Sequence, residues 1–282
     1  MSMIKNILVS GLLLLVTQLL QAQEEYIFSY WNYEKGNQAI VSAAMANVRS
    51  KPSLKGAVTD SLECGTGVQI TSNPVNLTKL KGLDAPWFGV RYKKDGKEKT
   101  GFIWAGLLAI GSSADADGRI FLFGIHQEKE REEMVQQQVS VIVLNAERKI
   151  LTEKQFWRQV SGQSYYTCKL IGALGLKAVD NIFRMEFSGE ACGIATNYFY
   201  YAWNGTELLE LPGKTRVSDA GVYYYTENLL FPSEHKGKDD LIIKWIISEA
   251  MADEDEDEVV ASEIEKKKEI YNWDGRNYKK QE

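Results

Sequence analysis

The chain has 282 residues, of which 44% are hydrophobic and 11% aromatic, and its 33 basic and 38 acidic side chains give a formal net charge of −5. This apolar and aromatic content can build proper hydrophobic cores, which excludes a largely disordered chain. The negative charge argues against nucleic-acid binding, because such binding draws most of its affinity from cationic contacts to phosphates. The length suits two ordinary domains after a short leader.

The first 22 residues have the order of a secretory signal peptide. Lys5 is their only charge, and an apolar run from Ile7 to Leu20 leads to Gln21-Ala22-Gln23. We expect cleavage after Ala22. A membrane anchor is the alternative, but the run is about 14 residues long and a spanning helix needs roughly 20. We therefore expect an exported chain, in the periplasm or outside the cell, with no transmembrane segment once residues 1–22 are removed.

Residues 23–39 form an N-terminal arm that is rich in aromatic side chains from Tyr26 to Tyr33. An apolar arm ahead of a small β-module either pairs as an extra strand or docks on the second domain. We expect it to dock within the chain.

Short strand-like segments broken by turn formers fill residues 40–112. The runs Trp87 to Tyr92 and Thr100 to Leu108 flank Asp95-Gly96. An Asp-Gly pair between two alternating runs predicts a tight hairpin, because glycine accepts the positive φ that the turn requires.

A set of residues with characteristic spacing runs through this module: Asn47, Val48, Arg49, Pro52, Ser53, Gly65, Trp87, Val90, Gly101 and Trp104. This set resembles the bacterial SH3-like domain family, whose members open with Asn-Val-Arg-x-x-Pro-Ser and close with Trp-x-x-Val, Gly-Lys and Gly-Trp-Val segments. Two features depart from the family: Phe102 stands where Trp is commoner, and Thr71 to Pro86 is a longer connection than usual. The resemblance implies a small β-barrel that acts as a binding or targeting module, frequently attached to cell-wall enzymes or envelope proteins.

Four residues of this module are candidates for ligand binding: Arg49, Trp87, Tyr92 and Trp104. The two tryptophans could form a stacking surface for a peptide or a glycan. Core packing is the competing role and the favoured one, because a barrel of about 65 residues needs most of its aromatic side chains to fill its interior.

Small polar residues from Gly111 to Gly118 mark the boundary to a second domain, residues 113–282. Beyond it an aspartate precedes an apolar strand three times, at Asp117, Asp180 and Asp240, with a spacing of roughly 60 residues. Such self-similarity predicts repeated β-units, arranged as hairpin repeats or as propeller-like blades.

A second repeated segment supports the two later copies, those that follow Asp180 and Asp240. Trp203-Asn204-Gly205 recurs as Trp273-Asp274-Gly275, and both segments predict hairpin turns between aromatic strands. The corresponding place in the first copy, around Asn145, lacks a glycine. Two copies are therefore better supported than three.

One short helix is predicted at residues 153–161. Thr152 and Gln155 have the spacing of a capping box, and an apolar stripe of Phe156, Trp157 and Val160 follows. The charged stretch from Glu128 to Gln138 is either a second helix or a wide loop. The predicted fold is therefore mainly β: a small SH3-like barrel followed by a larger β-rich domain with one short helix.

Residues suited to catalysis are few. The chain has two histidines and three cysteines. Cys168 and Cys192 are a candidate disulfide pair in an oxidising compartment, although both could equally be small buried free thiols. A cysteine hydrolase would pair one of them with His235, but neither lies in the Asp-Cys-Ser/Gly context that such enzymes show.

No spacing of metal ligands, phosphate-binding loop or dinucleotide fingerprint occurs, so we expect no cofactor and no metal site. The acidic run 253–258 could collect calcium, but a solvated loop is the favoured interpretation.

These observations favour an exported envelope binding or scaffold protein rather than an enzyme. Its SH3-like module would recognise a cell-wall peptide, a glycan or a protein partner of the envelope. The alternative is a cell-wall hydrolase with its active site in residues 113–282.

Overall fold

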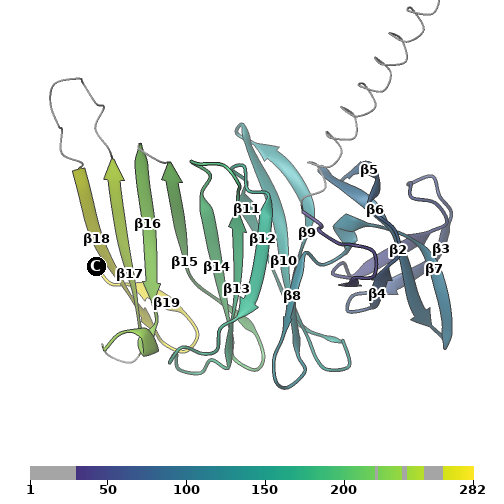
Figure 1. Cartoon of the computed structure of the whole chain (residues 1–282). Helices are drawn as coiled ribbons and strands as arrows, with labels where there is room; N and C mark the ends of the chain where they lie inside the picture. Colours follow the sequence, from purple (N-terminus) through teal and green to yellow (C-terminus); the bar gives the residue numbers. More distant parts are fainter. Residues whose placement is uncertain (1–29, 220–221, 237–239, 251–262) are drawn as a thin grey trace, which may run out of the picture.

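A computed structural model describes residues 30–219, 222–236, 240–250 and 263–282, and these form mainly antiparallel β-structure, which confirms the predicted fold class (Figure 1). Two single-turn 3-10 helices, η1 (Ala105–Leu107) and η2 (Pro232–Glu234), interrupt the strands. The predicted signal peptide and the acidic run 253–258 lie outside the described residues.

The first module is a seven-stranded antiparallel sheet in the order β1-β4-β6-β7-β2-β3, with β5 also paired to β6. Its strands alternate inward apolar and outward polar residues, as Ala46 and Val48 of β2 show. The predicted Asp95-Gly96 hairpin joins β6 to β7. The strands are β1 (Gln38–Ile40), β2 (Met45–Arg49), β3 (Val58–Glu63), β4 (Gly67–Ile70), β5 (Val75–Leu80), β6 (Leu83–Lys94) and β7 (Lys97–Trp104).

The long connection from Thr71 to Pro86 contains a hairpin, formed by β5 and the start of β6. Lys81 and Gly82 have φ values of 52° and 79° at its two-residue turn, so both central residues have the positive φ of a type I′ turn. The tip docks on the next sheet, where the Glu128 N–H donates to the Lys81 carbonyl at 3.0 Å.

The remaining strands form three consecutive four-stranded meanders, here called units 1 to 3 (Figure 1). Unit 1 has β8 (Gly111–Ala114), β9 (Ile120–Arg131), β10 (Met134–Leu144) and β11 (Ile150–Gln159). Unit 2 has β12 (Tyr165–Leu170), β13 (Asn181–Ser188), β14 (Thr196–Trp203) and β15 (Leu208–Asp219). Unit 3 has β16 (Tyr223–Leu230), β17 (Leu241–Ala250), β18 (Glu263–Trp273) and β19 (Tyr278–Lys280).

A related turn closes the third hairpin of each unit, with one residue more in unit 1 than in units 2 and 3. The Oδ1 atoms of Asn145, Asn204 and Asp274 accept backbone N–H groups of the residues that follow, at distances from 2.7 to 3.0 Å. Asparagine and aspartate favour such turns because their short side chains reach the backbone two to four residues on. All three units therefore contain an Asn or Asp turn at this place. In unit 1 the residue with positive φ is Arg148, at 62°, whereas in units 2 and 3 it is the glycine that directly follows the Asn or Asp.

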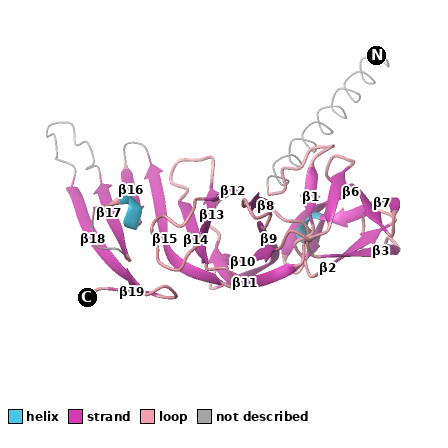
Figure 2. Ribbon diagram, turned by 90° about the horizontal axis from the view of Figure 1, so that it is seen from below, coloured by secondary structure: helices cyan, strands magenta, loops and turns pink. Residues whose placement is uncertain are grey.

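Units 2 and 3 are fused edge to edge, since β15 pairs with β16 within one eight-stranded sheet that runs in chain order from β12 to β19. Unit 1 is a separate four-stranded sheet. The strands of all three units follow one bowed band with the first module at its end (Figure 2). Hairpin repeats describe this arrangement, and propeller-like blades do not, because the two later units share one continuous sheet.

A single hydrophobic core joins the first module to units 1 and 2. It contains Trp31 and Trp87, the Phe121 and Phe123 side chains of β9, and Trp203 of β14. Aromatic contacts cross between the two sheets: the ring of Phe121 lies 5.9 Å from Phe183 and 6.1 Å from Trp203. The sheet of unit 1 begins at Gly111, two residues before the expected boundary.

The described part of the N-terminal arm docks on the rest of the chain and also pairs as a strand with the first module. The Tyr30 ring lies 5.2 Å from Tyr166 of β12, Trp31 is buried in the shared core, and the Tyr33 hydroxyl donates to the Ala109 carbonyl. The strand β1 then joins β4 of the first module.

The predicted helix at 153–161 is wrong. This segment is mostly β11, which pairs with β10 along its length, with Phe156 opposite Val139. Phe156 packs on Phe199 of β14, at 5.0 Å between ring centroids, whereas Trp157 is partly exposed beneath the Lys129 ammonium. The charged stretch from Glu128 to Gln138 is neither helix nor wide loop: it is the end of the β9–β10 hairpin.

Candidate binding site on the first module

Trp87 and Trp104 lie inside the first module, 1% and 2% exposed. The inserted hairpin covers them: the Trp87 indole N–H donates to Thr78 Oγ1 at 2.8 Å, and the Trp104 N–H lies 3.0 Å from the Thr78 carbonyl. Their ring faces are therefore core surfaces in this structure and offer no stacking platform.

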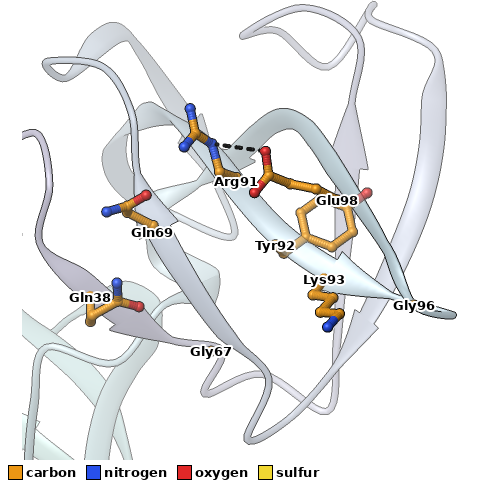
Figure 3. Close-up of a pocket in the computed structure, with 8 residues that line it drawn as sticks. All are labelled: Gln38, Gly67, Gln69, Arg91, Tyr92, Lys93, Gly96 and Glu98. Carbon is orange, nitrogen blue, oxygen red and sulfur yellow. Dashed lines mark ion pairs between the residues drawn. The ribbon is translucent and has the colours of Figure 1, made fainter.

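The other two sequence candidates have different surroundings. The Arg49 guanidinium donates to the carbonyls of Leu54 and Gly56, so it holds the loop after β2. Tyr92 is buried except at its edge and lines an open pocket with seven other residues (Figure 3).

This pocket has a volume of about 390 Å³, within the usual range of small-ligand sites. Strand pairing builds its base, because Gln38 of β1 is in register with Gln69 of β4, and Gln69 with Arg91 of β6. The three side chains thus form a polar row across three neighbouring strands (Figure 3). The complete lining is Gln38, Gly67, Gln69, Arg91, Tyr92, Lys93, Gly96 and Glu98.

The charges of the pocket are mixed. Arg91 and Lys93 project from the same face of β6, and Arg91 Nε lies 3.6 Å from Glu98 Oε1 of β7 (Figure 3). Both members of this pair are about half exposed or more, so the pair holds the guanidinium only weakly. A ligand carboxylate can therefore compete with Glu98 for Arg91.

A charge cluster behind the pocket fixes its floor. Asp60 of β3 accepts hydrogen bonds from the Lys94 and Lys99 ammonium groups at 2.6 and 2.8 Å, which hold the pKa of that carboxyl well below its usual range. The Tyr92 hydroxyl donates to the same carboxylate at 3.2 Å. Burial, with this contact, raises the pKa of Tyr92 to about 12, so Tyr92 stays neutral.

The arrangement can recognise a ligand that carries amide and carboxylate groups. Each glutamine amide offers donors and an acceptor, and a guanidinium binds a carboxylate through two parallel N–H groups. Sequence reasoning missed Gln38, Gln69 and Arg91, because they come from three separated strands and only strand pairing brings them together.

The three cysteines are free thiols in the described structure, so the Cys168–Cys192 disulfide is not formed there. Cys192 is exposed in the β13–β14 connection. Burial raises the pKa of Cys64 to about 11 and that of Cys168 to about 12. A thiol with so high a pKa carries little thiolate at neutral pH.

We expect thiol labelling to separate these cysteines. In the folded chain Cys192 should react with iodoacetamide first, and Cys64 and Cys168 more slowly, because burial limits both access and ionisation. Mass spectrometry of tryptic peptides after timed quenching measures the order, with urea-unfolded protein as the control. A Cys168–Cys192 disulfide would appear as a linked peptide in the unreduced digest and would contradict this expectation.

The histidines make local contacts. His126 Nδ1 lies 3.1 Å from the Gly106 carbonyl, and burial lowers its pKa. His235 Nε2 lies 2.9 Å from the Leu241 carbonyl. Within the described ranges, no group of three or more His, Cys, Asp or Glu side chains is arranged to hold a metal ion.

No helix among the residues that the structure describes is long and apolar enough to cross a membrane. Comparison of the chain with known protein families, with curated proteins and with solved structures finds no match.

Proposed function

We propose that this chain is an exported envelope protein whose first module, an SH3-like barrel, binds a cell-wall peptide or glycan in the pocket of Gln38, Gln69 and Arg91. The observation that carries the proposal is the polar row across β1, β4 and β6, in register and open to solvent. Stem peptides and N-acetylated sugars of the wall present carboxylates and amides, which this row can pair with. Binding needs no cofactor.

The remainder of the chain supports a scaffold role. The tip of the inserted hairpin bonds to unit 1, and a shared core joins the first module to units 1 and 2. Exposed aromatic side chains lie on unit 3 of the eight-stranded sheet, among them Tyr224 of β16 and Trp245 of β17. An extended sheet held at one end by a binding module suits a protein that positions other envelope components.

A cell-wall hydrolase remains the alternative, but no contact in the described residues favours it. Cys168 packs near Gly111 and Phe123, and its raised pKa opposes a thiolate. His235 lies beside η2 and contacts the Leu241 carbonyl. A hydrolase would need these groups to share a proton.

Sedimentation of residues 23–282 with insoluble peptidoglycan tests the proposal. Arg91→Ala removes the guanidinium from the pocket, and we expect it to lower the retained fraction about tenfold, because a charge-assisted hydrogen-bonded pair contributes roughly 1.5–3 kcal/mol. The bound fraction is measured by gel densitometry against soluble protein. Arg131→Ala is the matched control, since Arg131 is exposed and pairs only with its neighbour Glu132 among the described residues.

Equal retention of the two variants and the parent chain would refute the pocket as the wall-binding site. No retention of the parent chain above an unrelated protein of similar charge would refute the wall as the ligand, and would leave a protein partner as the ligand of the module.

A further inference from the structure

A row of charged side chains crosses one face of unit 2. Strand pairing places Lys169 of β12 opposite Arg184 of β13, and Glu186 of β13 opposite Tyr198 of β14. Tyr198 in turn lies opposite Lys214 of β15. Residues opposite one another in antiparallel strands share a face of the sheet, and so do residues two apart along one strand. All of these side chains therefore lie on the same face of unit 2.

Two cations of this row gather around one aromatic ring. The guanidinium carbon of Arg184 lies 5.4 Å from the centre of the Tyr198 ring, and the ammonium nitrogen of Lys214 lies 4.7 Å from it. The negative face of an aromatic ring attracts cations in this way. Arg216, two residues after Lys214 on β15, adds a third cation to the same face. The chain as a whole is acidic, with a formal net charge of −5, so this cationic group is a local exception.

One carboxylate within the row compensates one of these cations. Glu186 Oε2 lies 3.2 Å from Arg184 Nη2, and Glu186 Oε1 accepts from the Tyr198 hydroxyl at 3.4 Å. The other donors are left over. Among the described residues, Arg184 Nε is buried without a hydrogen-bond partner, and neither Lys214 nor Arg216 forms an ion pair.

The position of Lys214 carries an electrostatic cost. Burial lowers the pKa of Lys214, and the charges of Arg184 and Arg216 lower it further, whereas those of Glu234 and Glu186 raise it. Together with the lysine of β12, the face holds four cations against these two carboxylates, which leaves an excess of two positive charges. Like charges held close together repel, and an anion between them would relieve the repulsion.

We propose that this face of unit 2 is a binding site for a phosphate monoester, with Arg184, Lys214 and Arg216 as its donors. Such a group carries a charge of about −1.5 to −2 at neutral pH and has three acceptor oxygens. Its charge matches the excess of the site, and its oxygens are enough for three cationic donors, whereas a carboxylate has two. Tyr198 and Glu186 are positioning residues that hold Arg184 and Lys214 side by side.

Thermal melting of residues 23–282 in phosphate and in chloride of equal ionic strength tests the site. A ligand that binds only the folded chain raises the melting temperature, by about 4 °C when inorganic phosphate is at ten times its dissociation constant. Lys214→Met keeps the aliphatic stem but removes the ammonium, and should lose most of this rise. Lys154→Met is the matched control and should keep the rise, because Lys154 is exposed on β11 of unit 1.

The phosphorus-31 line width of inorganic phosphate gives a second readout that does not depend on unfolding. The line should broaden with the parent chain and with Lys154→Met, and stay narrow with Lys214→Met. An equal rise in melting temperature in Lys214→Met, or no rise of the parent chain in phosphate, would overturn the proposal. A rise of the same size in acetate of equal ionic strength would also overturn it, since the site would then accept any anion.

Two sources of the phosphate group give different results. Vesicles of phosphatidylcholine with phosphatidic acid present the monoester at a lipid surface. Sedimentation of the parent chain with these vesicles, lost in Lys214→Met, would assign the phosphate to a lipid headgroup. A melting shift in phosphate without such sedimentation would assign it to a soluble phosphorylated compound. Arg91→Ala should keep the full shift in phosphate, which separates this site from the pocket of the first module.

Discussion

Trp104→Ala is expected to destabilise the chain by about 3–5 kcal/mol, the range for truncating a fully buried aromatic side chain. The side chain fills the core of the first module, and its indole N–H lies 3.0 Å from the carbonyls of Thr78 and Ala85. The change removes this volume and leaves two buried carbonyls without that donor.

Urea denaturation followed by circular dichroism measures the loss. Trp245→Ala is the control, because Trp245 is 39% exposed and should cost about 1 kcal/mol or less through its lost contact with the Lys268 ammonium. A Trp104→Ala chain with parental stability that no longer sediments with peptidoglycan would show instead that this tryptophan is a ligand-stacking residue.

Gly82→Ala is expected to loosen the first module from unit 1 and to cost about 2–5 kcal/mol. A Cβ at this position would lie 2.0 Å from the Glu128 carbonyl oxygen, a backbone atom that cannot move without bending β9. Overpacking contributes about 1–3 kcal/mol, and the positive φ adds about 1–2.

Gly96→Ala is a close control for this prediction. The Asp95-Gly96 turn has φ values of 53° and 74°, almost those of Lys81-Gly82, but a Cβ on Gly96 meets nothing within 4 Å. The difference between the two variants in the free energy of unfolding therefore gives the cost of the clash between the new Cβ at position 82 and the Glu128 carbonyl oxygen. Hydrogen exchange of the Glu128 amide, which donates to the Lys81 carbonyl, should accelerate only in Gly82→Ala. Equal stabilities of the two variants would show that the hairpin tip does not carry the module contact.

The parts of the fold that follow from local chemistry could be predicted from the sequence. Asn204-Gly205 and Asp274-Gly275 form the expected hairpin turns, and strands begin directly after Asp180 and Asp240. Asn145 is harder to identify, since its turn has one residue more before the next strand and a positive φ at Arg148 instead of a glycine.

The predicted helix at 153–161 is wrong because tertiary contacts decide the conformation of this segment. Phe156, Trp157 and Val160 have helical spacing, but pairing with β10 and the contact of Phe156 with Phe199 decide the conformation. Helix propensity is a weak preference that such packing overrides. Strand pairing also explains the missed pocket: the aromatic residues that suggested a site fill the core, and the amides of Gln38 and Gln69 carry no local signal.

The outer edge of the eight-stranded sheet carries crowded charged side chains, which disfavour pairing with a further strand. The last strand, β19, pairs only with Tyr271 to Trp273 of β18, and the Gln281 N–H donates to the Ile270 carbonyl, so within the described residues Ile264 to Glu269 have no outer strand partner. Five of these six residues are Glu265, Lys266, Lys267, Lys268 and Glu269, and crowded charges on an edge strand discourage pairing with another chain. Edge-to-edge association of this sheet with a strand of another chain is thereby disfavoured.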